Sequence, residues 1–323
     1  MAVDFPEPKF ADSNGIRIAY YEMGEGMPVV LCHGFPELAF SWHKVMPMLA
    51  EAGYRAIAVD QRGYGRTEAP PKTEDYSVKH LAGDIAGLLD ALDIEKAVYV
   101  GHDWGAPVVW NSAILQRDHV AGVIGVNNPY TPEIPDDPLK LLREEWGDAH
   151  YMVNFHNKGP DDPESSDVKY NANVEKVFRG LYRKALFKMD DFLSLPKEQR
   201  VLTMDNIVFN PDPPGEFVLD DDELAYFVEA FTRTGFTPGL NWYRNISQNW
   251  RDTKDLDKHI HVPCLMIEVT DDPSGPPGCT EQMRPYIKNL ESTVIKDCGH
   301  WTGHEKPEEL SRIMIDWLDR TYP

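Results

Sequence analysis

Hydrophobic and polar positions along the chain follow two alternating patterns. Short, continuously apolar runs are typical of strands that are buried on both faces of a parallel sheet. They occupy residues 28–32, 55–60, 98–102, 120–126 and 262–267, and residues 292–295 supply a last short strand. Apolar residues recur every three or four positions in residues 78–92, for which Ser77 is a suitable N-cap, and again in residues 310–318 after the last strand. This alternation predicts an α/β fold with a mostly parallel central sheet flanked by helices.

Two segments depart from this alternation. Residues 15–22 alternate only partly between apolar and polar, which predicts an early antiparallel strand. Between about residues 130 and 242 the spacing is helical, and proline-rich loops such as residues 210–215 interrupt it. A helical block inserted between two strands of one sheet is a cap. We therefore expect a core domain from residues 1–130 and 246–323 and a helical cap domain from residues 131–245.

Composition and charge exclude several classes of partner. The 323 residues suffice for one large domain with an insertion. The net charge of −21 argues against a nucleic acid or an anionic membrane, and no apolar run approaches the roughly 18 residues of a membrane helix. Residues 1–8 lack the features of a secretory signal, so we expect a cytoplasmic protein. The cysteines have no CxxC spacing, which favours reduced thiols over disulfides or a metal site: Cys32, Cys264, Cys279 and Cys298.

The strongest chemical signal is a carboxylate between two glycines. In the run Val-Tyr-Val-Gly-His-Asp-Trp-Gly-Ala, Asp103 lies between Gly101 and Gly105. This is the Gly-x-nucleophile-x-Gly form of the nucleophile elbow of α/β-hydrolases, a strained strand-to-helix turn that exposes one side chain. A carboxylate nucleophile attacks an sp³ carbon that carries a leaving group, and the resulting ester is hydrolysed by water. The motif alone equally allows a buried aspartate that caps the helix starting near Ala106.

Residues 33–36, His-Gly-Phe-Pro, follow the strand at residues 28–32. In this fold that position supplies half of an oxyanion hole through a backbone N–H group. We expect the N–H groups of Phe35 and Trp104 to be the two donors, because Trp104 follows the nucleophile at a helix N-terminus. An ordinary Gly-Pro turn is the alternative reading of the tetrapeptide.

A general base and its acidic partner follow the last two strands. His300 comes after the strand at residues 292–295, and the unperturbed pKa of histidine, about 6.5, suits a base. It also comes last in the order nucleophile, acid, histidine that this fold has. Asp271 and Asp272 follow the strand that ends near Ile267, and their position does not decide which of them orients His300. An Asp-Asp-Pro segment is also an ordinary turn.

Together these residues resemble the epoxide hydrolases of the α/β-hydrolase superfamily over nearly the whole chain. The likeness is carried by residues 33–36, residues 60–67 (Asp-Gln-Arg-Gly-Tyr-Gly-Arg-Thr), residues 101–106, the cap, Asp272, and His300 with Trp301. The resemblance implies that two cap tyrosines, Tyr151 and Tyr243, hydrogen-bond the epoxide oxygen, and it favours Asp272 over Asp271. Trp104, Phe155 and Trp242 are then expected to bind the substrate.

The resemblance implies conversion of epoxides to vicinal diols. Asp103 would form a hydroxyalkyl ester, which water activated by His300 and Asp272 hydrolyses. No cofactor or metal is expected, and the expected partners are a small-molecule epoxide and water, with a homodimer allowed. The alternative is a haloalkane or haloacid dehalogenase with the same Asp-His-Asp triad, which Trp104 also fits, whereas Tyr243 favours the epoxide. A non-catalytic binding protein of this fold is less favoured, because every catalytic role has a residue.

Overall fold

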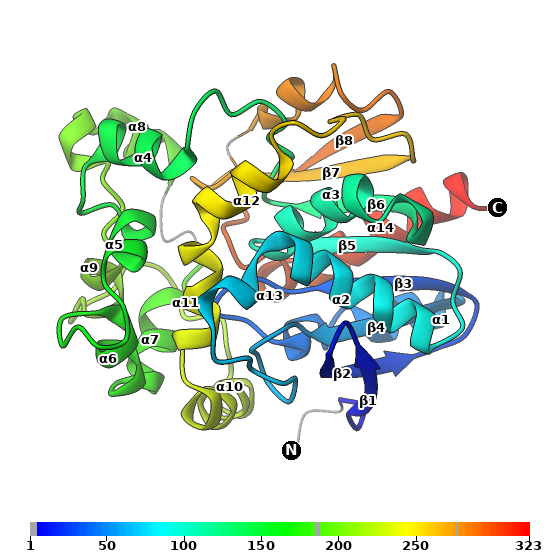
Figure 1. Ribbon diagram of the computed structural model, residues 1–323, viewed down its shortest axis with the longest axis horizontal. Helices are drawn as coiled ribbons and strands as arrows, with labels where there is room; N and C mark the ends of the chain where they lie inside the picture. The colour runs from blue at the N-terminus through cyan, green and yellow to red at the C-terminus, as the bar shows by residue number, and fades with distance from the viewer. Residues whose placement is uncertain (1–4, 185–187, 276) are drawn as a thin grey trace.

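The computed structural model describes residues 5–184, 188–275 and 277–323, and a single sheet runs through its centre (Figure 1). The eight strands have the order β1-β2-β4-β3-β5-β6-β7-β8. They are β1 (Lys9–Ser13), β2 (Ile16–Met23), β3 (Met27–Cys32), β4 (Tyr54–Asp60), β5 (Ala97–His102), β6 (Val120–Val126), β7 (Cys264–Val269) and β8 (Leu290–Ile295). Strands β3 to β8 are parallel, and β1 and β2 are antiparallel. The predicted α/β architecture is confirmed.

The five apolar runs form β3 to β7, the predicted last strand at residues 292–295 lies within β8, and the partly alternating segment forms the antiparallel strand β2. The pattern did not predict β1. This edge strand is largely exposed, so burial did not select apolar residues there. Residues 1–4 of the segment read for a secretory signal lie outside the described residues.

Helices cover both faces of the sheet (Figure 1). One face packs against α2 (Val78–Ala91) and α3 (Gly105–Leu115), and the other packs against α1 (Met46–Glu51) and α14 (Pro307–Thr321). Alternate residues of β3 divide between these two apolar layers, Val30 in the first and Leu31 in the second. Strands β3 to β7 contribute to both layers because they are largely buried on both sides. The core therefore holds the carboxyl ends of β3, β5, β6 and β7 rigidly in one row.

Nine helices among the described residues lie between β6 and β7: α4 (Pro138–Trp146), α5 (Tyr151–Asn157), α6 (Ser166–Asn171), α7 (Val174–Leu181), α8 (Met189–Ser194), α9 (Met204–Val208), α10 (Asp221–Thr234), α11 (Thr237–Arg244) and α12 (Ile246–Thr253). Most lie together on one side of the sheet (Figure 1). This block corresponds to the predicted cap, and the boundaries 131–245 remain a prediction. Helix α12 packs on α2 of the core, where Asn249 accepts a hydrogen bond from the Val78 N–H group.

Smaller expectations have mixed outcomes. Ser77 occupies the N-cap position of α2, but its hydroxyl contacts the His80 ring instead of a backbone N–H group of the helix. The four cysteines are free, and Cys32, Cys264 and Cys298 are buried. Within the described residues, none of the helices combines the length and the apolar character needed to span a membrane.

Candidate active site

Asp103 lies on the tight turn between β5 and α3, at the carboxyl edge of the sheet. Its φ of +49° is in the left-handed region, which a non-glycine residue rarely adopts. Both flanking glycines are required by close approach. A Cβ atom on Gly101 would overlap the carbonyl of Gly105, and one on Gly105 would overlap the carbonyl of Cys32. The predicted elbow is therefore present, and it turns the Asp103 side chain away from the core.

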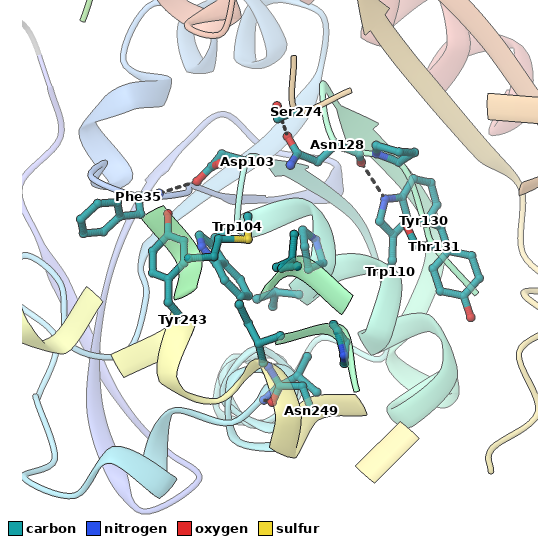
Figure 2. A pocket seen from close by; sticks show the side chains of 18 of the residues that line it. Phe35, Asp103, Trp104, Trp110, Asn128, Tyr130, Thr131, Tyr243, Asn249 and Ser274 are labelled. Carbon is teal, nitrogen blue, oxygen red and sulfur yellow. Dashed lines mark hydrogen bonds between the residues drawn. The ribbon is translucent and has the colours of Figure 1, made fainter. Parts of the chain in front are cut away.

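The Asp103 carboxylate does not cap the following helix. Its Oδ1 atom accepts the Phe35 N–H group at 2.7 Å, while the N-cap of α3 is Trp104 and makes no side-chain capping bond (Figure 2). Gly34 allows this approach, because a Cβ atom there would overlap the Asp103 side chain. The loop after β3 thus points its N–H group at one carboxylate oxygen and leaves the other oxygen free.

His300 lies between two carboxylates. Its Nδ1 atom is 2.8 Å from Oδ2 of Asp272, and its Nε2 atom is 3.7 Å from Oδ2 of Asp103. Asp271 is engaged elsewhere, since its carboxylate accepts the Thr270 hydroxyl and its backbone N–H bonds the Cys298 carbonyl. Asp272 is therefore the aspartate that contacts His300, and the three predicted triad side chains come together at the sheet edge.

A cavity of about 560 Å³ opens above Asp103 between the core and the cap (Figure 2). Its lining includes Trp104 and His300 from the core, and Tyr151 from α5 and Tyr243 from α11. The Tyr243 ring is 5.0 Å from that of Trp104 and 5.9 Å from that of Tyr151. The two cap tyrosines thus lie beside each other in the lining of the cavity, with Tyr243 next to Trp104.

Comparison with known proteins agrees with this geometry. A family model described as alpha/beta hydrolase fold matches residues 27–307. Epoxide hydrolase A of Mycobacterium tuberculosis is 38% identical over 325 residues, which cover 97% of each chain. Bifunctional epoxide hydrolase 2 of Sus scrofa is 35% identical over 94% of this chain, which spans only 54% of that relative's length. The crystal structure of Epoxide Hydrolase A from Mycobacterium thermoresistibile is 34% identical, with a TM-score of 0.83 over 97% of this chain and 98% of the other.

The chain belongs to the epoxide hydrolase family of α/β-hydrolases. Two of the three residues that were expected to bind substrate, Phe155 and Trp242, do not line the cavity, whereas Trp104 is among the described residues that do. Phe155 packs against Tyr243, and Trp242 is fully buried with its indole N–H on the Arg62 carbonyl. On helix α11, Tyr243 therefore faces the cavity, whereas Trp242 points into the protein interior.

The charges around His300 explain its ionisation. Burial alone would lower the pKa of His300, but the negative charge and hydrogen bond of Asp272, with the charge of Asp103, raise it to about 10. Burial opposes ionisation of Asp272 as well. The His300 charge and the hydrogen bonds from His300, Asn127 and Ser274 outweigh it and hold the Asp272 pKa well below its usual value. Burial raises the pKa of Asp103, an effect that the charges of His300 and His102 partly offset.

Asn127 is a site residue that sequence reasoning missed. Its amide nitrogen donates to Oδ2 of Asp272 at 2.7 Å and to the His300 carbonyl at 3.2 Å, and its oxygen accepts the Thr302 hydroxyl. It stands at the end of β6 with a φ of +66°. Its place directly after a buried strand was the available signal. The residue links the acid to the loop that carries the base.

A buried ion pair, also missed from the sequence, lies beneath the nucleophile. Glu37 accepts the Gly34 N–H group at 2.6 Å and contacts His102 Nδ1 at 2.8 Å. His102 Nε2 is 2.7 Å from the His300 carbonyl, so both ring nitrogens face acceptors and the ring is an imidazolium. Burial disfavours both charges, yet the pair raises the pKa of His102 and lowers that of Glu37 to about 2. This pair ties together the loops that carry Phe35, Asp103 and His300.

The cap is joined to two of the same loops. The Tyr182 hydroxyl donates to the Pro36 carbonyl at 3.0 Å, and the Trp301 indole N–H donates to the Leu181 carbonyl at 2.7 Å. The Tyr182 and Trp301 rings stack with their centroids 3.9 Å apart. In the part of the chain that the structure describes, no group of three His, Cys, Asp or Glu side chains is arranged to hold a metal ion.

Proposed function

We propose that this family member hydrolyses epoxides to vicinal diols through a covalent ester on Asp103. The observation that supports it best is the arrangement of that carboxylate. Oδ1 is held by the Phe35 N–H group, and Oδ2 is free to attack a carbon atom in the cavity that Tyr151 and Tyr243 line. A carboxylate in this setting forms an ester with an alkyl carbon, a step that uses no metal or cofactor.

In the first step, Oδ2 of Asp103 attacks an epoxide carbon and the carbon–oxygen bond of the ring breaks. The electron pair of that bond stays on the epoxide oxygen, which takes a proton from Tyr151 or Tyr243 and a hydrogen bond from the other. Burial and the Asp103 charge raise the pKa of both phenols, so each is a protonated donor at neutral pH. The product of this step is a hydroxyalkyl ester.

In the second step, His300 removes a proton from water, and the resulting hydroxide attacks the Asp103 carbonyl carbon. The ester carbonyl oxygen is the former Oδ1 atom, which already receives the Phe35 N–H group; the Trp104 N–H group is the second donor. Collapse of the tetrahedral intermediate releases the diol and restores the carboxylate, and the proton taken from water stays on His300, as before the reaction.

Ester formation also prepares the base. While Asp103 is ionised, its charge helps to keep the pKa of His300 near the value of about 10, so the imidazole is protonated at neutral pH. Esterification removes that charge, and the pKa of His300 falls. The imidazolium can then give its proton to the phenolate that the first step left, and the neutral imidazole is the base that removes a proton from water.

The test is to incubate the purified chain with styrene oxide and with haloalkanes of matched size, and to follow diol and halide together. We expect diol, with a loss of at least about a thousandfold in Asp103→Asn, because the nucleophile is gone. Asp271→Asn is the matched control, since Asp271 does not contact His300. Halide without diol would identify a dehalogenase, and neither product would identify a non-catalytic binding protein.

A further inference from the structure

His150 brings a polar group to an otherwise apolar part of the cavity wall. It is the N-cap residue of α5, directly before Tyr151, and its ring lies 4.9 Å from the Tyr151 ring. The residue is only 7% exposed, and it lines the cavity. Its Nδ1 atom is buried and has no hydrogen-bond partner among the described residues. Buried polar atoms are rarely left unpaired, so the imidazole has unused hydrogen-bonding capacity.

The ring is neutral and has one N–H group. Burial lowers the pKa of His150 to about 4, so the imidazole carries no charge at neutral pH. A proton on Nδ1 would be a buried donor without an acceptor, and that arrangement is unfavourable. The proton therefore belongs on Nε2, which is not among the buried unpaired atoms of the described residues. Because His150 lines the cavity, the imidazole can offer this hydrogen-bond donor to a bound molecule.

The surroundings of this donor are apolar. The Tyr151 N–H group bonds the Leu202 carbonyl at 2.9 Å, which places the segment after residue 201 beside the start of α5. The cavity lining there includes Met152, Leu202, Met204 and Ile207, and none of these side chains is a strong hydrogen-bond acceptor. The His150 N–H group would therefore find its hydrogen-bond acceptor on a bound ligand.

We propose that His150 Nε2–H binds an ether or carbonyl oxygen on the substituent of the epoxide, and that the enzyme thereby prefers epoxides with oxygen-bearing substituents. This inference rests on the proposed function. His150 is a specificity residue in this scheme and takes no part in proton transfer. An alkyl substituent leaves the donor unpaired in the complex, which weakens transition-state binding relative to the ether.

The test uses two epoxides that differ in one atom: phenyl glycidyl ether and 4-phenyl-1,2-epoxybutane, in which a methylene group replaces the ether oxygen. The quantity measured is the ratio of kcat/KM for the ether to that for the hydrocarbon, compared between variants so that intrinsic reactivity cancels. We expect the ratio to fall about threefold to tenfold in His150→Leu, the range for one hydrogen bond. His150→Gln keeps an N–H donor and should retain most of the wild-type ratio.

His156→Leu is the matched control, because His156 is on the same helix but outside the cavity lining. It should leave the ratio unchanged. If His150→Leu gives the wild-type ratio, the inference is overturned, whether or not both rates fall together through a structural effect. If the wild-type protein hydrolyses neither epoxide, the proposed function fails first, so the two failures are distinguishable.

Discussion

The Nε2 atom of His300 stands 3.7 Å from Oδ2 of Asp103, beyond hydrogen-bond distance but close enough for strong electrostatic coupling. The attacking oxygen is therefore not occupied by the base. The histidine is held from its other side by Asp272 at 2.8 Å, which leaves Nε2 directed at the nucleophile. This spacing separates the two steps, because the same histidine faces first a carboxylate and then an ester.

Removal of the Asp103 charge should lower the pKa of His300. The charges of Asp272 and Asp103 both help to raise that pKa to about 10. In Asp103→Asn the Asp103 charge is lost, and the contacting carboxylate of Asp272 still raises the pKa. Titration of the ring nitrogens by NMR, with Asp271→Asn as the control, would measure the shift. An unchanged His300 pKa would mean that the two side chains are not coupled.

Replacement of His300 by glutamine should stop the reaction at the ester. Alkylation needs only Asp103 and the phenols, whereas hydrolysis needs the base. The mass of the intact protein should increase by the mass of one epoxide molecule after a single addition. The same treatment of Asp103→Asn should add nothing. Continued turnover of His300→Gln without an adduct would remove the role proposed for His300.

Loss of a cap phenol should slow alkylation and spare hydrolysis. Tyr243→Phe and Tyr151→Phe each remove one donor to the epoxide oxygen, for which we expect a loss of about 10²–10³ in the alkylation rate. Rapid-quench measurement of ester formation separates this step from the next. Tyr170→Phe is the control, because that buried cap hydroxyl bonds Asp205. A slowed hydrolysis step with normal alkylation would contradict the assignment.

Asn127→Ala should destabilise the protein and slow hydrolysis. The amide bonds the ionised Asp272, and removal of a hydrogen bond to a charged group costs about 1.5–3 kcal/mol of unfolding free energy. Ester should accumulate during turnover, because Asp272 and His300 lose their alignment. Asn14→Ala is a matched control, since Asn14 also has a positive φ and bonds Asp84 far from the site. Equal accumulation in both variants would show that Asn127 acts only on stability.

The Glu223 carboxylate should make cap–core stability depend on pH. Glu223, on cap helix α10, is 2.9 Å from His43 and 2.6 Å from Lys44 of the core. Burial opposes its charge, but these hydrogen bonds hold its pKa well below the usual value. Its contribution is therefore complete above the unfolded pKa of about 4.3 and is lost as the pH falls further. Glu223→Gln should lower the free energy of unfolding, and with it Tm, most at neutral pH, by about 1–3 kcal/mol. The deficit should shrink progressively as the pH falls below 4.

The control for that experiment is Glu229→Gln, an exposed position on the same helix. Its Tm should follow that of the wild type across the pH range. If the stability lost in Glu223→Gln stays the same at low pH, the packing of the Glu223 side chain, and not its charge, accounts for its contribution to stability.

The parts of the fold that follow from local sequence were predictable. Strands β3 to β7 are largely buried on both faces, so burial alone required apolar residues along each of them. The elbow was visible because steric contact requires glycine at positions 101 and 105. Strand β1 was not predicted, since an exposed edge strand places little demand on its sequence.

The parts of the site that depend on distant contacts were not predictable. Asn127 and Asp272 are 145 positions apart, and Glu37 and His102 are 65 positions apart. No periodicity relates such pairs. Sequence position places Trp242 on the correct helix, but the rotation of that helix against the core decides which of its side chains reaches the cavity.

The stacking of Tyr182 on Trp301 has a consequence for how substrate enters the site and product leaves it. A hinged cap would have to break that stack, together with the Pro36 and Leu181 bonds, each time it opened. Because Pro36 adjoins Phe35 and Trp301 adjoins His300, every such opening would also dismantle the catalytic geometry. We therefore expect the cap to stay fixed on the core during turnover, with substrate and product passing along the cavity without opening of the cap.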